Sequence, residues 1–77
     1  MPKWEYLFVS SEVSRDHWRP KYLNGDLIPD WEQQPVIHDY CNQLGAQEWE
    51  LVNIVLERDL LLSPPCYRLI FKRHRPE

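Results

Sequence analysis

Glycine is scarce in this sequence of 77 residues, with Gly25 and Gly45 alone, and so is cysteine, with Cys41 and Cys66 alone. Two cysteines are too few for a disulfide scaffold, so both are expected to be buried thiols. No apolar run approaches the roughly 20 residues of a membrane-spanning helix. The first residues, Met-Pro-Lys-Trp-Glu-Tyr, lack the basic and apolar segments of a secretory signal. We therefore expect a reducing, cytoplasmic location.

Motifs for catalysis and metal binding are also lacking. His17, His38 and His74 fall on three separate predicted elements, without the close ligand pair that zinc sites usually show. Cys41 follows His38 by three residues, but it lies on the apolar side of a predicted helix, which favours packing over nucleophilic catalysis. The sequence contains no P-loop and no dinucleotide-binding glycine motif. These absences predict a protein that is not an enzyme and that has no catalytic residue, metal or cofactor.

Charge is unevenly distributed along the chain. The net charge of −3 argues against general nucleic-acid binding. Residues 26–50 contain six acidic side chains and no lysine or arginine, whereas residues 51–77 contain five basic and three acidic side chains. Solvated surfaces that keep a small protein soluble are one interpretation, and electrostatic pairing between subunits is the other.

The first half of the chain has the pattern of strands and turns. Residues 4–12 are rich in aromatic and β-branched side chains and carry apolar groups on both faces, as in a strand covered on each side. After a turn at 14–16, residues 17–23 can return as an irregular edge strand, because Pro20 lacks a backbone donor. Asn24-Gly25 predicts a type I′ turn and a brief return strand.

A single helix is predicted in the middle of the chain. Pro35 suits its first turn, and apolar residues then recur at the spacing of one helical face from Ile37 to Leu44. Gly45 fits the left-handed position at which helices often end. The opposite side of the helix is polar, so the helix is expected to cover one face of a sheet.

Two further strands complete the predicted fold. Residues 49–57 alternate so that Val52, Ile54 and Leu56 should face the helix. A connection over 58–65 leads to the last strand over 67–72, which is expected at the centre of the sheet.

The expected architecture is a single α+β domain over residues 1–77, with a loose tail over 73–77. Its sheet is small and antiparallel-rich, with three main strands and a possible extra irregular edge strand, and one helix packs on one face in a βαββ-like order.

Three short motifs occur in order along the chain: Lys3-Trp4-Glu5-Tyr6, then Leu44-Gly45 followed by Trp49-Glu50-Leu51-Val52, then Phe71-Lys72-Arg73. With them the sequence resembles domain-of-unknown-function family 4177, short bacterial domains with the pattern KWEY, LG-x-x-GWELV and a terminal FKR. The resemblance runs from the first strand to the last. It implies a βαββ-like fold and no catalytic residues, because the family has none assigned.

One feature extends this resemblance, and one departs from the family pattern. Trp18-Arg19-Pro20, Asn24-Gly25 and Asp30-Trp31 resemble a subgroup with a longer first connection. The glycine that the family pattern places before Trp49 is Glu48 here. If that position needs a positive φ, Glu48 must either be strained or follow a different corner.

Aromatic residues provide the main functional signal. One helix covers one face of the sheet, so a second apolar face must be covered by the long first connection, which carries Trp18 and Trp31, or by another copy of the chain. We expect a non-catalytic interaction module that forms a homodimer and binds a protein partner or a small ligand. The predicted interface consists of Trp4, Tyr6, Phe8, Tyr67, Leu69 and Phe71. The predicted segment for a partner or ligand consists of Trp18, Arg19, Tyr22, Asn24 and Trp31.

Two other functions stay open. A nucleic-acid-associated regulator could use the basic C-terminal strand, although Tyr67 and Phe71 alternate with Arg68 and Lys72 and therefore face the other way. A small enzyme or ligand-binding subunit could form its site between copies. The run Leu60-Leu61-Leu62 is a second candidate apolar patch.

Overall fold

The computed structural model describes residues 3–59 and 63–75 as one small α+β domain. The sheet has the strand order β3-β2-β1-β5-β4 and is antiparallel throughout. This confirms the predicted fold class, with β5 between β1 and β4 and with β2 and β3 added beyond β1. The elements are β1 (Lys3–Ser14), β2 (His17–Leu23), β3 (Asp26–Leu27), a 3₁₀ turn (Trp31–Gln33), α1 (Ile37–Ala46), β4 (Glu50–Asp59) and β5 (Ser63–Arg75).

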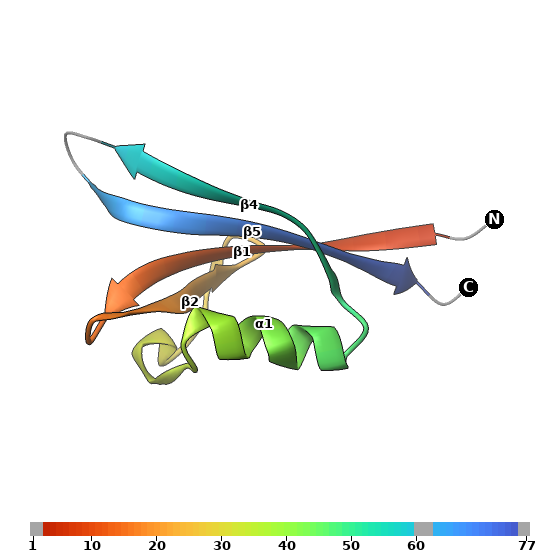
Figure 1. Ribbon diagram of the computed structural model, residues 1–77, viewed down its shortest axis with the longest axis horizontal. Coiled ribbons are helices and arrows are strands. Elements are labelled where there is room, and N and C mark those ends of the chain that lie inside the picture. The colour runs from red at the N-terminus through yellow and green to blue at the C-terminus, as the bar shows by residue number, and fades with distance from the viewer. Residues whose placement is uncertain (1–2, 60–62, 76–77) are drawn as a thin grey trace.

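The long path between β1 and β4 determines where the helix lies. Both strands pair antiparallel with β5, so they run parallel to each other and need a crossover between them. That crossover contains β2, β3 and α1. In Figure 1, α1 runs beneath β1 and β2, whereas β4 lies on the opposite side of the view. One edge of the sheet therefore receives little cover from the helix.

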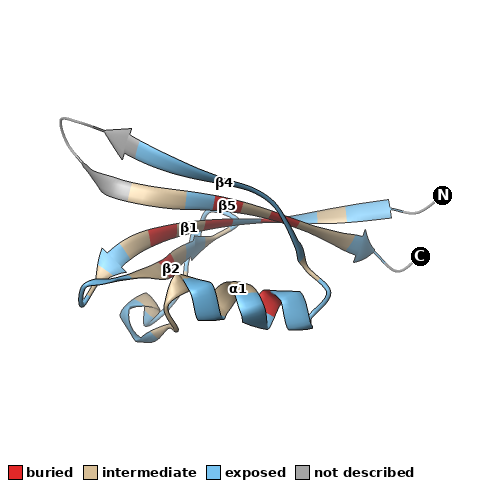
Figure 2. Ribbon diagram, in the orientation of Figure 1, coloured by how far each residue is buried: buried red, intermediate tan, exposed pale blue. Residues whose placement is uncertain are grey.

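The core forms where α1 meets the central strands. Leu7 of β1 is opposite Phe71 of β5, and Val9 is opposite Leu69, so these four side chains point to the same face of the sheet. This face is the one that α1 covers. These four side chains and Leu44 of α1 are buried and form one cluster. The helical face predicted from the sequence is thus confirmed. Figure 2 shows this buried set confined to the middle of the domain.

The β2–β3 hairpin has the predicted turn. Asn24 and Gly25 both have positive φ, at 51° and 87°, as a type I′ turn requires. Tyr22 then pairs with Leu27, so the chain returns only briefly. Asn24 also continues the pairing with β1, because its backbone N–H donates to the Phe8 carbonyl at 2.8 Å and its Oδ1 accepts from the Phe8 N–H at 2.9 Å.

A bulge in β2 accommodates Pro20. The register shifts so that Ser11 is opposite Pro20 and Ser10 is opposite Tyr22, which leaves Lys21 as the extra residue. Pro20 is buried. Across the sheet, regular pairing of β1 with β5 ends at Ser10. The Ser11 hydroxyl continues it by donating to the Tyr67 carbonyl at 3.0 Å and accepting from the Tyr67 N–H at 3.2 Å.

The left-handed residue that follows the helix lies three positions later than expected. Gly45 is helical, and the left-handed residue is Glu48, with φ 72°. The Trp49 N–H donates to the Leu44 carbonyl and the Glu48 N–H donates to the Gly45 carbonyl, both at 3.0 Å. These two bonds form a Schellman motif, in which the residue after the last helical turn needs positive φ. The prediction of Gly45 as the terminating residue was therefore wrong, and the family pattern's glycine position is the one under strain.

Other boundaries also differ from the expectation. Residues 73–75 are not a loose tail, because β5 continues to Arg75, opposite Lys3. The connection predicted over 58–65 is shorter, since β4 reaches Asp59 and β5 begins at Ser63. The run Leu60-Leu61-Leu62 lies outside the described residues.

Candidate interaction surface

The six residues predicted to form an aromatic interface do not share one face of the sheet. Leu69 and Phe71 are only 1% exposed and belong to the core beneath α1. Tyr67 lies on the same side and packs against that core. Their grouping with Trp4, Tyr6 and Phe8 was wrong, because antiparallel register places Leu69 and Phe71 opposite Val9 and Leu7 rather than opposite the β1 aromatics.

The three β1 aromatics lie on the other face, which we call the open face. Tyr6 and Phe8 are 54% and 53% exposed, and Trp4 is exposed as well. Their neighbours on β5 are mostly basic: His74 is opposite Trp4, and Lys72 is opposite Tyr6. The Trp4 ring stacks on His74 at 4.0 Å between centroids, and the Lys72 Nζ lies 4.4 Å from the centre of the Trp4 ring. The open face is therefore an aromatic surface with cations beside it.

The first connection does not cover the open face. Its strands β2 and β3 extend the sheet sideways beyond β1. Trp18 packs on the helix side, with its ring edge against Tyr67 at 4.7 Å between centroids. Trp31 lies near Lys21, whose Nζ is 4.9 Å from the centre of its ring. Because Tyr6 and Phe8 stay more than half exposed, Trp18 and Trp31 do not bury the β1 aromatics.

A second apolar surface lies along β4, which forms an edge of the sheet. Ile54 and Leu56 point to the helix side, opposite Leu69 and Tyr67, and Val55 points to the open face, opposite Arg68. The prediction that Val52, Ile54 and Leu56 face the helix was therefore right about the direction of Ile54 and Leu56, whereas Val52 falls at a bulge and Leu51 is opposite Phe71. It was wrong about burial, because α1 does not extend over this edge. Figure 2 shows β4 exposed along its described length from Glu50 to Glu57. The exposed apolar residues of β4 are Leu51, Val52, Ile54, Val55 and Leu56.

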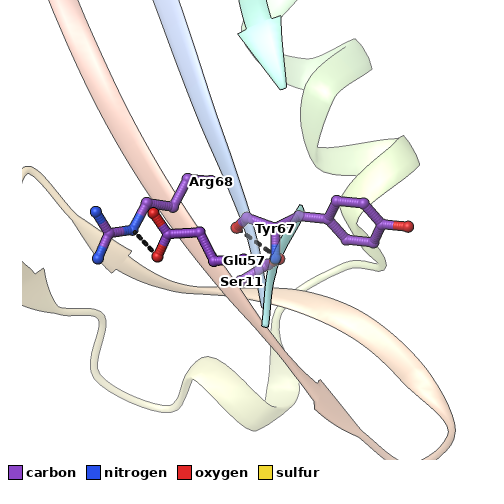
Figure 3. A network of polar contacts seen from close by, with 4 residues as sticks. All are labelled: Ser11, Glu57, Tyr67 and Arg68. Carbon is purple, nitrogen blue, oxygen red and sulfur yellow. Dashed lines mark hydrogen bonds and ion pairs between the residues drawn. The ribbon is translucent and has the colours of Figure 1, made fainter. Parts of the chain in front are cut away.

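An open groove of about 460 Å³ crosses the open face between β1, β5 and β4. Phe8, Val55 and Ile70 provide apolar walls, and Gly25 of the β2–β3 turn lines it as well. Arg68 and Glu57 provide its charged groups and form an ion pair at 3.1 Å, shown in Figure 3 beside the Ser11–Tyr67 bonds. The pair is exposed and contributes little to stability.

The segment predicted to bind a partner or ligand has structural contacts within the chain. Arg19 donates to the backbone carbonyls of Ser14 and Gln34, and so holds the segment before α1 against β2. Asn24 anchors its turn to Phe8, and Trp18 packs on Tyr67. The Lys21 ammonium group lies near both the Tyr22 ring and the Trp31 ring. These five residues therefore have positions explained by folding alone.

Groups that could do chemistry are dispersed. Cys41 packs on the core beneath α1, whereas Cys66 is opposite Glu57 on the open face, so the sheet lies between the two thiols. Burial raises the pKa of the Cys41 thiol, which keeps it protonated and unreactive at neutral pH. The His38 ring lies 3.4 Å from the Asn42 amide. Within residues 3–59 and 63–75, no three His, Cys, Asp or Glu side chains gather as a metal site would require.

The sequence contained a signal for β4 that the prediction did not use. Residues of both parities from Leu51 to Leu56 are apolar, except Asn53. Such a continuous run is typical of a strand buried on both faces of its sheet.

In the described part of the chain, no helix is long and apolar enough to cross a membrane. No protein family model, curated protein or solved structure matches the chain.

Proposed function

We propose that this protein is a non-catalytic interaction module that works as a homodimer. The observation that carries the proposal is apolar surface left uncovered on the open face and on β4. Single chains rarely leave so many neighbouring apolar side chains in water, and a domain of this size has little core of its own. Association that covers part of this surface removes that part from water and stabilises the fold at the same time.

The size of the exposed surface supports a second copy as the partner. The chain exposes 5830 Å². A compact monomer of 9.4 kDa exposes about 5000 Å², so the excess is about 800 Å². A partner in an interface of standard size contributes about the same area. The radius of gyration of 13.3 Å also exceeds the roughly 11.5 Å of a compact domain of this length.

Light scattering coupled to size exclusion tests this proposal directly. We expect about twice the mass of 9.4 kDa across the micromolar range. A mass of one chain at the highest concentrations would contradict the proposal, and it would mean that the apolar surface serves a different molecule.

Single-stranded nucleic acid is a second candidate, favoured by one specific observation. On the open face, Lys72 is opposite Tyr6 and Arg68 is opposite Ser10, so cations and exposed aromatics share one surface. Sheets of this kind bind single strands by stacking bases on aromatic rings and by pairing phosphates with cations. Along β5 itself, the aromatic side chains point to the helix side and the cations point to the open face. The aromatic side chains of β1 point to the open face, so they share one surface with the β5 cations.

Fluorescence anisotropy with a labelled single-stranded RNA and a matching DNA tests this second candidate. Binding should weaken as salt rises, and Phe8→Ala should weaken it roughly tenfold through the loss of stacking. Val13→Ala, at the far end of β1, is the matched control. Absence of binding at low salt would exclude the candidate.

Membership of family 4177 is part of the proposal as well. The positive φ of Glu48 supports it, because the family pattern has glycine at that position and glycine is the residue such a backbone favours.

A further inference from the structure

The two edges of the sheet differ in how they are protected. One edge is β3, which has only two residues, and short edge strands limit pairing with other chains. The other edge is β4, which has ten. Residues 50–57 contain no lysine and no proline, which natural proteins place on edge strands to prevent pairing. Within the described ranges, no strand pairs with the outer side of β4.

The backbone of β4 shows which groups face outward. The Asn53 Oδ1 accepts a hydrogen bond from the N–H of Ile54, its neighbour in the chain, at 2.8 Å. An N–H bonded to β5 would have no need of this acceptor, so the N–H of Ile54 faces away from β5. Backbone direction alternates along a strand, and Leu56 therefore also presents its N–H and carbonyl outward, whereas Val55 bonds to β5.

We propose that a second copy of the chain pairs with this edge, β4 against β4 and antiparallel, about a two-fold axis at Val55. This inference rests on the proposed homodimer and names its contact. In that register Ile54 is opposite the partner's Leu56, and the outward backbone groups of these two residues bond each other. The Ile54 N–H then exchanges the Asn53 Oδ1 for the carbonyl of the partner's Leu56. Asn53 is opposite the partner's Glu57, so its amide donates to a carboxylate that also accepts from Arg68.

Side-chain direction excludes a register shifted by one residue, and side-chain polarity disfavours a shift of two residues towards the N-terminus. Partners in an antiparallel pair must point to the same face, and Ile54 and Leu56 share the helix side, whereas Asn53, Val55 and Glu57 share the open face. A shift of one residue would place Ile54 opposite Val55, which point to opposite faces. A shift of two residues towards the N-terminus would place Asn53 opposite Val55, a polar group against an apolar one. The bulge between Leu51 and Asn53 limits regular pairing to residues 53–57.

The resulting dimer joins two sheets into one of ten strands, five from each copy. The two-fold axis is perpendicular to the sheet, so both helices lie on one side and both open faces lie on the other. Exposed apolar side chains of β4 then pack against their counterparts on both faces. The Trp4, Tyr6 and Phe8 surfaces stay accessible and are doubled on a single side of the dimer.

Three lysine substitutions at similarly exposed positions test which surface makes the contact. They are Ile54→Lys on the β4 edge, Tyr6→Lys on the open face and Leu27→Lys on the β3 edge, at 49%, 54% and 55% exposure. We expect Ile54→Lys to raise the dimer dissociation constant by about 100-fold, because the two-fold axis places two charges in the contact. The other two variants should stay dimeric. Circular dichroism checks that each variant is folded.

Cross-linking tests the register. Val55→Cys, made with Cys41→Ala and Cys66→Ala, places two thiols at a non-hydrogen-bonded pair, where Cα atoms are about 4.5 Å apart and a disulfide fits. Leu56→Cys in the same background is the control, because its two copies are offset by two residues, about 7 Å along the strands, in addition to the spacing between the strands, and so lie beyond disulfide reach. We expect oxidation to link the first variant quantitatively and to leave the second largely unlinked.

The outcomes separate this inference from the proposed function. A wild-type dimer that Tyr6→Lys dissociates and Ile54→Lys does not would overturn β4 pairing, leave self-association intact and place the contact on the open face. A dimer that Ile54→Lys dissociates, but in which Leu56→Cys links and Val55→Cys does not, would overturn the register. A monomeric wild type would overturn both proposals.

Discussion

Trp49 and Leu44 are joined by a hydrogen bond from the Trp49 N–H to the Leu44 carbonyl, at 3.0 Å, across the end of α1. Leu44 belongs to the buried core and Trp49 packs against that core, so both ends of this hydrogen bond are held in place by apolar packing. This corner turns the chain from the helix into β4. The corner requires a conformationally unfavourable residue, Glu48, because its φ of 72° is disfavoured for a residue with a side chain.

Glu48→Gly should stabilise the protein by about 0.5–1 kcal/mol. The left-handed backbone costs an L-residue roughly 1–2 kcal/mol, and the greater freedom of glycine in the unfolded chain offsets part of the gain. Urea unfolding gives the difference. Glu48→Ala is the control, because it removes the carboxylate and keeps the backbone strain. Equal stabilisation by both variants would mean that charge rather than backbone conformation matters there.

Gly45→Ala should also stabilise the protein, by about 0.5–1 kcal/mol, because alanine is the better helix former. Gly45 is helical, and a methyl group added there meets nothing within 4 Å. Thermal unfolding of this variant measures the effect. A loss of stability would place the left-handed residue at Gly45 and contradict the Schellman corner at Glu48.

Ser11→Ala should destabilise the fold by about 1–3 kcal/mol. The Ser11 hydroxyl is buried and bonds both backbone groups of Tyr67, at the point where regular pairing of β1 with β5 ends. Its removal leaves those two groups without partners in the sheet. Ser10→Ala, on the open face next to it, is the matched control and should change stability by less than about 0.5 kcal/mol. Similar values for the two serines would reject this role for Ser11.

Asn24→Ala should cost about 1–2 kcal/mol, because it removes the bond to the Phe8 N–H and places alanine at φ 51°. Asn24→Gly separates these contributions, since glycine accepts the backbone conformation and lacks the Oδ1 acceptor. We expect it to be closer to the wild type than alanine. Chemical denaturation of the two variants side by side provides the comparison.

Alkaline pH should weaken the fold from about pH 9 upward. Burial raises the pKa of Cys41 from its ordinary 9.0 and of Tyr40 from 10.0, and the hydrogen bond to Glu12 raises the pKa of Lys21 from 10.5. The folded chain thus keeps these protons longer than the unfolded chain, so stability is full below pH 9 and falls as pH rises.

Unfolding curves between pH 7.5 and 10.5 measure this loss. Cys41→Ala should flatten the first part of the decline and Tyr40→Phe the part near pH 10, where their unfolded forms ionise. Variants whose stability declines in parallel with the wild type at every pH would contradict the assignment to these two groups.

Local patterns determined several features without any knowledge of the fold. Asn24-Gly25 specifies its turn because both residues tolerate positive φ, and the apolar residues from Ile37 to Leu44 specify the helix because their spacing matches its period. Local sequence did not predict where that helix ends. Gly45 had the right residue type, but the chain takes the left-handed conformation at Glu48, where the packing of Trp49 on the core determines the corner.

Tertiary structure alone decided which surfaces are buried. Alternation along a strand divides its residues into two faces, and it does not say which face meets the helix. Pairing of β5 with β1 placed Phe71 and Leu69 in the core and left Tyr6 and Phe8 outside. Likewise, the apolar run of β4 indicates a strand covered on both faces, yet only the strand order shows that its outer side is unpaired within the part of the chain that the structure describes. The physical reason is that burial depends on contacts between segments distant in the sequence, whereas turns and helices depend on residues close together in it.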